Sequence, residues 1–249
     1  MLRLGGVVPP SPLGSAAPSL ALGSVVPPPL INCSAKLLGK VIDAPPIRAS
    51  LRVMEHVASL AAGRSFVEIG SRHGDLIDCV SHLTSSAVSI EGDHHYCKTL
   101  KRRADASGGR WSTVCTMFTS ETNPMPRGSL YFTWVPHYLD VPFLFAFAAQ
   151  QARGGIPNSS RIAVGFDMHH PPEVRCWRAI RRFSESHTRV AFDERIKGLR
   201  GNQHRRHGNT TIAVFAPANI SMAEVQRATN NICHKGDPSR ATRTIALGS

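Results

Sequence analysis

The sequence lacks any long apolar run, any paired-cysteine motif and any surplus of acids. No apolar stretch approaches the ~20 residues that a helix needs to cross a bilayer, so no membrane span is predicted. The six cysteines stand singly, and none forms a Cys-x-x-Cys pair. The 17 acids against 29 lysines and arginines give a formal net charge of +12. A chain this basic favours an anionic partner.

The single cysteines lie in apolar surroundings. Cys79, Cys97 and Cys115 fall inside patterns of buried helix or strand. Such positions suit free, buried thiols, which favour a reducing compartment. The expected location is therefore intracellular, in the cytoplasm or an organelle.

The N-terminal segment lacks acids as well, since none precedes Asp43. Residues 1–29 are rich in Pro, Gly, Ser, Ala and Val, and residues 4–10 are echoed by residues 22–28. This composition predicts disorder. Acid-poor, serine-containing N-termini are typical of organellar transit peptides, but the sparse basic residues and many prolines favour a plain disordered arm. We expect an arm over residues 1–33, a folded domain over 34–235 and a basic tail over 236–249.

The most informative pattern in the sequence covers residues 66–76. Phe66, Val67 and Ile69 predict a short buried strand. Gly70 permits a tight turn and a close ligand approach, and Gly74 opens a helix. Such a strand, turn and helix place backbone N–H groups at the edge of a sheet, where open α/β folds bind nucleotide-like ligands.

A second predicted strand, residues 87–91, ends in Glu91. An acid about 20 residues beyond a glycine turn is placed to accept hydrogen bonds from ribose hydroxyls. A dinucleotide site of the GxGxxG type would need a third glycine, where this chain has Arg72. That difference counts against a nicotinamide cofactor, which remains an alternative.

The pattern E-x-G-x-x-x-G followed by a strand ending in Glu resembles the class I S-adenosylmethionine-dependent methyltransferases. Residues 67–74 resemble the first motif of that family, and residues 90–93 its second. The resemblance implies S-adenosylmethionine as cofactor, with Glu68 near its methionine end, Glu91 at its ribose and Asp93 on its adenosine side. The turn residues implied in cofactor binding are Gly70, Ser71 and Gly74.

The rest of the chain alternates strands and helices, which predicts a mostly parallel sheet. No helical pattern separates the last two predicted strands, so we expect them to form an antiparallel hairpin. The fold class is therefore α/β, a Rossmann-like seven-strand sheet with a C-terminal hairpin, as in class I methyltransferases. The seven strands are expected at residues 66–69, 87–91, 111–118, 130–135, 161–166, 188–192 and 210–215.

His137 is the candidate general base, because it follows the fourth strand, where the family places its substrate-facing motif. The family's amino-methyltransferases often carry D/N-P-P-Y/F there, and residues 134–138 lack that acid or amide. The fifth strand is followed by Asp167, His169 and His170. Their carboxylate and imidazole groups could supply part of a binding site for a divalent cation. No acid ends the fourth strand, so no metal site is predicted.

Over half of the excess positive charge lies between Arg175 and Arg206, where ten basic residues face three acids. Much of this segment is predicted to be the loop between the last two strands. Clustered Arg and Lys suit an anionic methyl acceptor or RNA, although few aromatic residues accompany them for base stacking. A solvated loop is one alternative. A non-catalytic protein that binds RNA or a protein through this basic hairpin is another.

Overall fold

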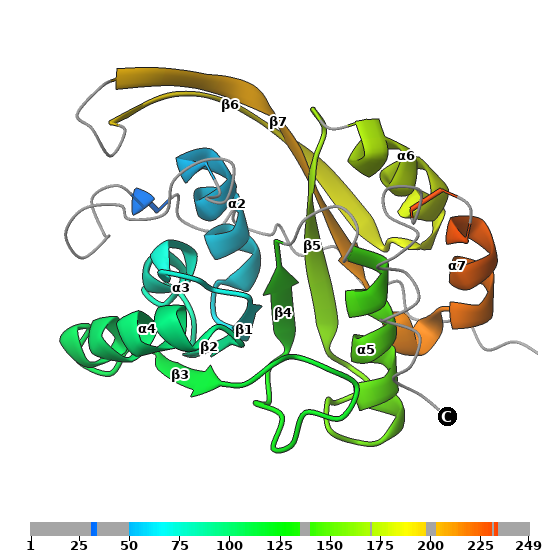
Figure 1. The fold of residues 1–249 in the computed structure, drawn as a ribbon, viewed down its shortest axis with the longest axis horizontal. Coiled ribbons are helices and arrows are strands. Elements are labelled where there is room, and N and C mark those ends of the chain that lie inside the picture. The colour runs from blue at the N-terminus through cyan, green and yellow to red at the C-terminus, as the bar shows by residue number, and fades with distance from the viewer. Residues whose placement is uncertain are drawn as a thin grey trace, which may run out of the picture.

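The computed structural model describes residues 31–33, 50–134, 140–169, 171–197, 203–230 and 232–233. Seven strands form one sheet in the order β3-β2-β1-β4-β5-β7-β6 (Figure 1). Strands β1 to β5 run parallel, and β7 lies antiparallel to both β5 and β6. The predicted α/β sheet with a terminal antiparallel hairpin is therefore confirmed. The strands are β1 (Ser65–Ile69), β2 (Ser86–Glu91), β3 (Ser112–Cys115), β4 (Leu130–Thr133), β5 (Arg161–Asp167), β6 (Ser186–Lys197) and β7 (Gln203–Phe215).

Helices cover both faces of the sheet (Figure 1). One face carries α2 (Leu51–Ala61), α3 (Asp75–Val80) and α4 (His94–Ala106). The other carries α5 (Asp140–Ala152), α6 (Pro171–Ile180) and α7 (Met222–Thr229). Within the described residues, no helix is long and apolar enough to cross a membrane.

Strand β1 shows why the sheet is buried on both sides. Phe66 packs into the core beneath α2, α3 and α4, whereas Val67 and Ile69 pack into the core beneath α5 and α6. Successive side chains of a strand point to opposite faces, so a central parallel strand needs apolar residues at consecutive positions. The consecutive apolar residues Phe66 and Val67 distinguish β1 from a strand that is exposed on one face.

The helix before β1 begins as its sequence predicts. Ser50 caps α2, and its side chain accepts a 3.2 Å hydrogen bond from the Val53 amide. Gly63 follows the helix with a φ of 70°. A serine cap and a left-handed glycine are the usual start and stop of a helix.

The C-terminal hairpin is much longer than predicted. The β6–β7 ladder pairs residues from Ser186↔Val214 to Lys197↔Gln203, so most of the basic segment expected in a loop lies in paired strands. A two-stranded ladder satisfies backbone hydrogen bonds without apolar side chains. The polar sequence of this segment was therefore interpreted as a loop although it forms strands. The hairpin extends past the parallel strands toward α2 (Figure 1).

The expectation of free thiols is wrong. Three disulfides join Cys33 to Cys79, Cys97 to Cys115 and Cys176 to Cys233, and no cysteine is free. Their Cα–Cα distances are 5.3, 5.7 and 4.8 Å. The partners are far apart in sequence, so spacing could not pair them, although the even count of six was a signal. The argument for a reducing compartment rested on free thiols and loses its support.

The first of these bonds also ties residues 31–33 to the folded domain. Ile31 and Cys33 are buried in the core beneath α2 and α3. Cys33 reaches Cys79 on α3. Part of the segment expected as an arm therefore packs against the domain.

Candidate functional site

The turn after β1 is shaped by three residues with positive φ. Gly70 has a φ of 79°, Arg72 of 49° and Gly74 of 87°. A Cβ on Gly74 would lie 2.7 Å from the Leu100 side chain, so packing and backbone angle both require glycine there. A Cβ on Gly70 would meet nothing within 4 Å, which leaves open space above the turn.

Glu91 links this turn to the end of β2. The Arg72 amide donates a 2.7 Å hydrogen bond to Glu91 Oε2, and the Asp93 amide donates a 2.8 Å bond to Oε1. The carboxylate is buried and fixed in orientation. A carboxylate has about four acceptor positions, so each oxygen can still accept a hydrogen bond from a ligand hydroxyl.

The other predicted cofactor residues lie around the same edge. Ser71 is buried, and its hydroxyl donates to the Glu68 carbonyl at 3.3 Å, so it closes the turn. Glu68 is buried on β1, one position before Ile69. Asp93 caps α4 by accepting from the His95 and Tyr96 amides at 2.8 and 3.3 Å. Asp93 therefore has a structural role whether or not it touches a ligand.

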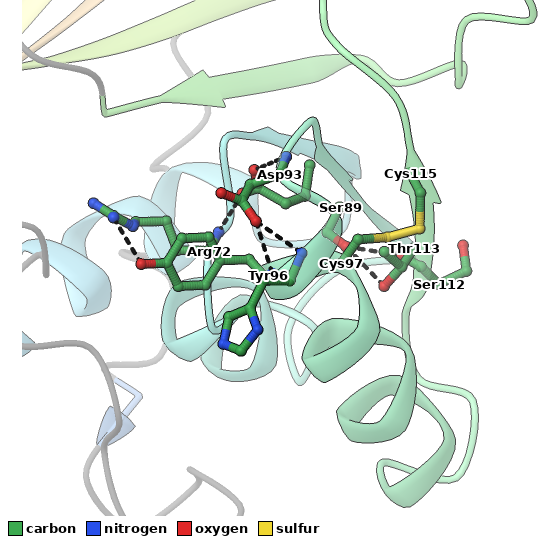
Figure 2. Close-up of a disulfide and its surroundings, with 10 residues drawn as sticks. Arg72, Ser89, Asp93, Tyr96, Cys97, Ser112, Thr113 and Cys115 are labelled. Carbon is green, nitrogen blue, oxygen red and sulfur yellow. Dashed lines mark hydrogen bonds between the residues drawn. A yellow bond between two sulfur atoms is a disulfide. The ribbon is translucent and has the colours of Figure 1, made fainter.

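A cluster that the sequence did not single out lies beside Glu91. The Arg72 guanidinium lies 4.8 Å from the centre of the Tyr96 ring and donates to the Tyr96 hydroxyl at 3.0 Å (Figure 2). His73 meets the same ring edge-on, with centroids 4.8 Å apart. The cluster secures the turn against α4.

Met117 is the second site residue that the sequence did not reveal. Its side chain is 67% exposed, although it follows the end of β3 at the ligand-facing edge. A Cβ on Gly92 would lie 2.0 Å from the Met117 sulfur, so the two residues are in direct contact. An exposed apolar side chain next to Glu91 offers a surface for a flat, apolar ring. The contact depends on the fold and leaves no local pattern.

A buried ion-pair network lies behind the turn. Arg103 contacts Asp75 at 2.8 Å and Asp78 at 3.2 Å, and Arg110 contacts Asp78 at 3.0 Å. Arg103 also donates to the His73 carbonyl at 2.7 Å. These bonds join α3, α4 and the turn, so they hold the two helices that frame the site.

The carboxyl ends of β4 and β5 form the neighbouring part of this edge. Thr133, the last residue of β4, has a buried hydroxyl without a hydrogen-bond partner among the described residues. Its register partner on β1 is Ile69, next to the glycine turn. His137 lies outside the described residues, so its predicted role as a base stays a prediction.

Beyond β5, two acids lie together. The Asp167 amide donates to Glu173, and Asp167 Oδ1 accepts from the His169 amide at 3.0 Å. Burial, together with the nearby Asp167 carboxylate, raises the pKa of Glu173 to about 8. His169 Nε2 accepts a 2.9 Å hydrogen bond from the Asn209 amide, so the ring proton of the neutral form is on Nδ1. His170 lies outside the described residues. Within the described ranges, no three His, Cys, Asp or Glu side chains form a metal-binding group.

A cavity of about 520 Å³ lies at the opposite edge of the sheet. Glu121, Met125, Gln150 and Arg153 are among its lining residues. These residues precede β4 or lie at the end of α5, near the amino ends of the parallel strands (Figure 1). The cavity is therefore separate from the Gly70–Glu91 edge.

The solved structures similar to this chain share its fold. Precorrin-6y C5,15-methyltransferase from Geobacter metallireducens is 10% identical, with a TM-score of 0.51 over 70% of this chain and 91% of that one. Precorrin 8w decarboxylase from Methanobacterium thermoautotrophicum is 13% identical, with a TM-score of 0.50 over 70% and 95%. An S-adenosylmethionine-dependent O-methyltransferase from Thermotoga maritima is 11% identical, with a TM-score of 0.50 over 75% and 71%. No protein-family model matches the chain, and no curated protein matches it.

The chain therefore has the Rossmann-like fold of the class I S-adenosylmethionine-dependent methyltransferases. No subfamily is identified. The predicted resemblance is confirmed at the level of the fold.

Proposed function

We propose that this protein binds S-adenosylmethionine at the carboxyl edge of β1 and β2 and transfers its methyl group. The observation that carries the proposal is the buried Glu91 carboxylate, oriented by the Arg72 and Asp93 amides. A fixed carboxylate with spare acceptor positions suits the two hydroxyls of a ribose.

The residues around Glu91 fit the rest of the cofactor. Gly70 leaves open space over the turn, and Met117 provides an apolar surface beside Gly92. The same edge also carries the other predicted residues, Glu68, Ser71, Gly74 and Asp93. We propose that Glu68 or Asp93 contacts the cofactor directly.

Methyl transfer asks little of the protein beyond alignment. The bound cofactor supplies an activated methyl group on a sulfonium, so positioning of the acceptor provides much of the rate. His137 is the proposed base for an acceptor that must lose a proton. Thr133 ends β4 beside the glycine turn, and its buried hydroxyl has no hydrogen-bond partner among the described residues.

For the methyl acceptor we propose a chemical class and no particular molecule. The net charge of +12 favours an anionic acceptor, RNA included. The similar solved structures carry names with different substrates, so they do not select one.

A second candidate function is non-catalytic binding of RNA or a protein through the hairpin. The supporting observation is the length of the β6–β7 ladder, which carries a strongly basic sequence beyond the parallel sheet. Retained RNA binding in a Glu91→Ala variant, with no methyl transfer from either protein, would favour this function over the enzyme.

The test is calorimetric titration of the full chain with S-adenosylmethionine and S-adenosylhomocysteine. We expect micromolar binding of both, lost in Glu91→Ala and unchanged in Glu224→Gln, whose carboxylate lies on the exposed face of α7. NADH is the matched ligand control and should not bind. Absence of binding by either methyl-donor compound would overturn the proposal.

A further inference from the structure

We propose that the Cys97–Cys115 disulfide is a positioning element of the cofactor site, and that breaking it weakens cofactor binding. The inference rests on the proposed function, because it concerns the same edge of the sheet. It assigns a role to two residues that touch no predicted ligand themselves but hold the segments that do.

The disulfide is linked directly to two predicted cofactor residues, Glu91 at the ribose and Asp93 on the adenosine side. Cys115 ends β3 and is the register partner of Glu91 on β2. Cys97 lies in the first turns of α4, and its amide donates a 2.9 Å hydrogen bond to the Asp93 carbonyl. Figure 2 shows the bond joining α4 to the end of β3, beside Asp93 and Tyr96.

The bond lies where main-chain pairing stops. Strand β3 has four residues and lies at the edge of the sheet, where β2 is its one neighbour among the described strands. Its last paired residue is Cys115, opposite Glu91. Ser89 links to Thr113 through a 3.0 Å side-chain hydrogen bond, but that link lies two residues earlier. Edge segments without further pairing open most readily, so the disulfide secures the end of a short strand.

The segment secured in this way carries Met117. Because Met117 contacts Gly92, the disulfide fixes the apolar surface relative to Glu91. Opening the bond would let the end of β3 move away from α4. Glu91 and the apolar surface of Met117 would then no longer be held in fixed positions relative to each other.

One end of the bond is within reach of reductants. Cys97 is buried, with 1% exposure, whereas Cys115 is exposed. A thiolate can attack the Cys115 sulfur and release Cys97 as a thiolate, and a second thiol completes the exchange. The two cysteines gain two electrons and two protons, and two reductant thiols become one disulfide.

The first test compares two double variants of the full chain. The double variant Cys97→Ser with Cys115→Ser removes the proposed positioning bond. The control, Cys176→Ser with Cys233→Ser, removes the bond between α6 and the segment after α7, on the opposite face of the sheet from α4. S-adenosylhomocysteine affinity is measured well below the melting temperature of each variant. We expect at least about tenfold weaker binding in the first variant and unchanged affinity in the second. Equal affinity in both, or equal loss in both, would overturn the inference.

The second test uses wild-type protein and does not depend on a folded variant. If the bond favours binding, then ligand must favour the bond by the same factor, because coupling is reciprocal. In glutathione redox buffers, saturating S-adenosylhomocysteine should shift the Cys97–Cys115 equilibrium toward disulfide about tenfold and leave Cys176–Cys233 unshifted. Alkylation and mass spectrometry measure both. An unshifted Cys97–Cys115 equilibrium in protein that binds the ligand overturns this inference alone. No binding by oxidised wild type overturns the proposed function with it.

Discussion

The amide of Arg72 donates a 2.7 Å hydrogen bond to Glu91 Oε2, which ties the turn after β1 to the end of β2. Nineteen positions separate the two residues in sequence. The bond places the backbone of the turn and the acid that the sequence assigns to ribose in one rigid unit.

Arg72 occupies the left-handed region without being glycine, with a φ of 49°. A left-handed non-glycine residue costs roughly 1–2 kcal/mol. Arg72→Gly and Arg72→Ala both lose the contacts with Tyr96, but only the glycine variant relieves the backbone. We therefore expect Arg72→Gly to be more stable than Arg72→Ala by about 1 kcal/mol in urea unfolding. Equal midpoints, or a more stable alanine variant, would show that the turn is unstrained.

Asp78 is the centre of the buried network behind the turn, with contacts to Arg103 and Arg110. Its side chain is fully buried, so removing it takes an ion-pair partner from Arg110 and leaves Arg103 with Asp75. We expect Asp78→Ala to lower the free energy of unfolding by about 3 kcal/mol or more. The control is Arg227→Ala, which breaks an exposed pair with Glu224 and should cost less than about 1 kcal/mol. Similar losses in both variants would contradict the importance of burial.

Glu173 should make stability depend on pH. Because its pKa in the folded protein is raised to about 8, the folded state binds a proton that the unfolded state has already released. The stabilisation is complete below the ordinary glutamate pKa and is lost as the pH rises toward 8. Each pKa unit corresponds to about 1.4 kcal/mol, so the total loss is of the order of a few kcal/mol.

Glu173→Gln isolates this effect, since an amide mimics the protonated acid and does not titrate. We expect the variant to match the wild type near pH 5 and to exceed its unfolding free energy at pH 9. Denaturant unfolding at the two pH values measures the difference. A constant difference between variant and wild type across this range would show that Glu173 titrates normally.

The parts of the site that the sequence predicted are the ones that local pattern determines. Gly70 and Gly74 lie within five residues of each other and both have a positive φ, which glycine adopts most easily. Glu91 ends a short strand that contains the apolar residues Ala87, Val88 and Ile90. The parallel arrangement of the first five strands follows from the alternation of strands and helices. The terminal hairpin is predicted because no helical pattern separates the last two strands, although polar residues concealed its length.

The parts that the sequence missed depend on contacts between distant segments. Met117 reaches Gly92 only because β3 pairs with β2, and Tyr96 reaches Arg72 only because α4 packs beside the turn. The disulfide between Cys97 and Cys115 has the same origin. No periodicity or spacing in one segment encodes such a contact.

Hydrogen exchange of the full chain with and without S-adenosylhomocysteine tests the proposed cofactor site most directly. We expect the ligand to slow exchange of the amides of residues 70–74 and 91–93, and to leave exchange in α7 unchanged. Protection confined to other segments, such as the β6–β7 hairpin, would contradict the proposed site. Absence of ligand-dependent protection anywhere would contradict the claim that the protein binds this cofactor.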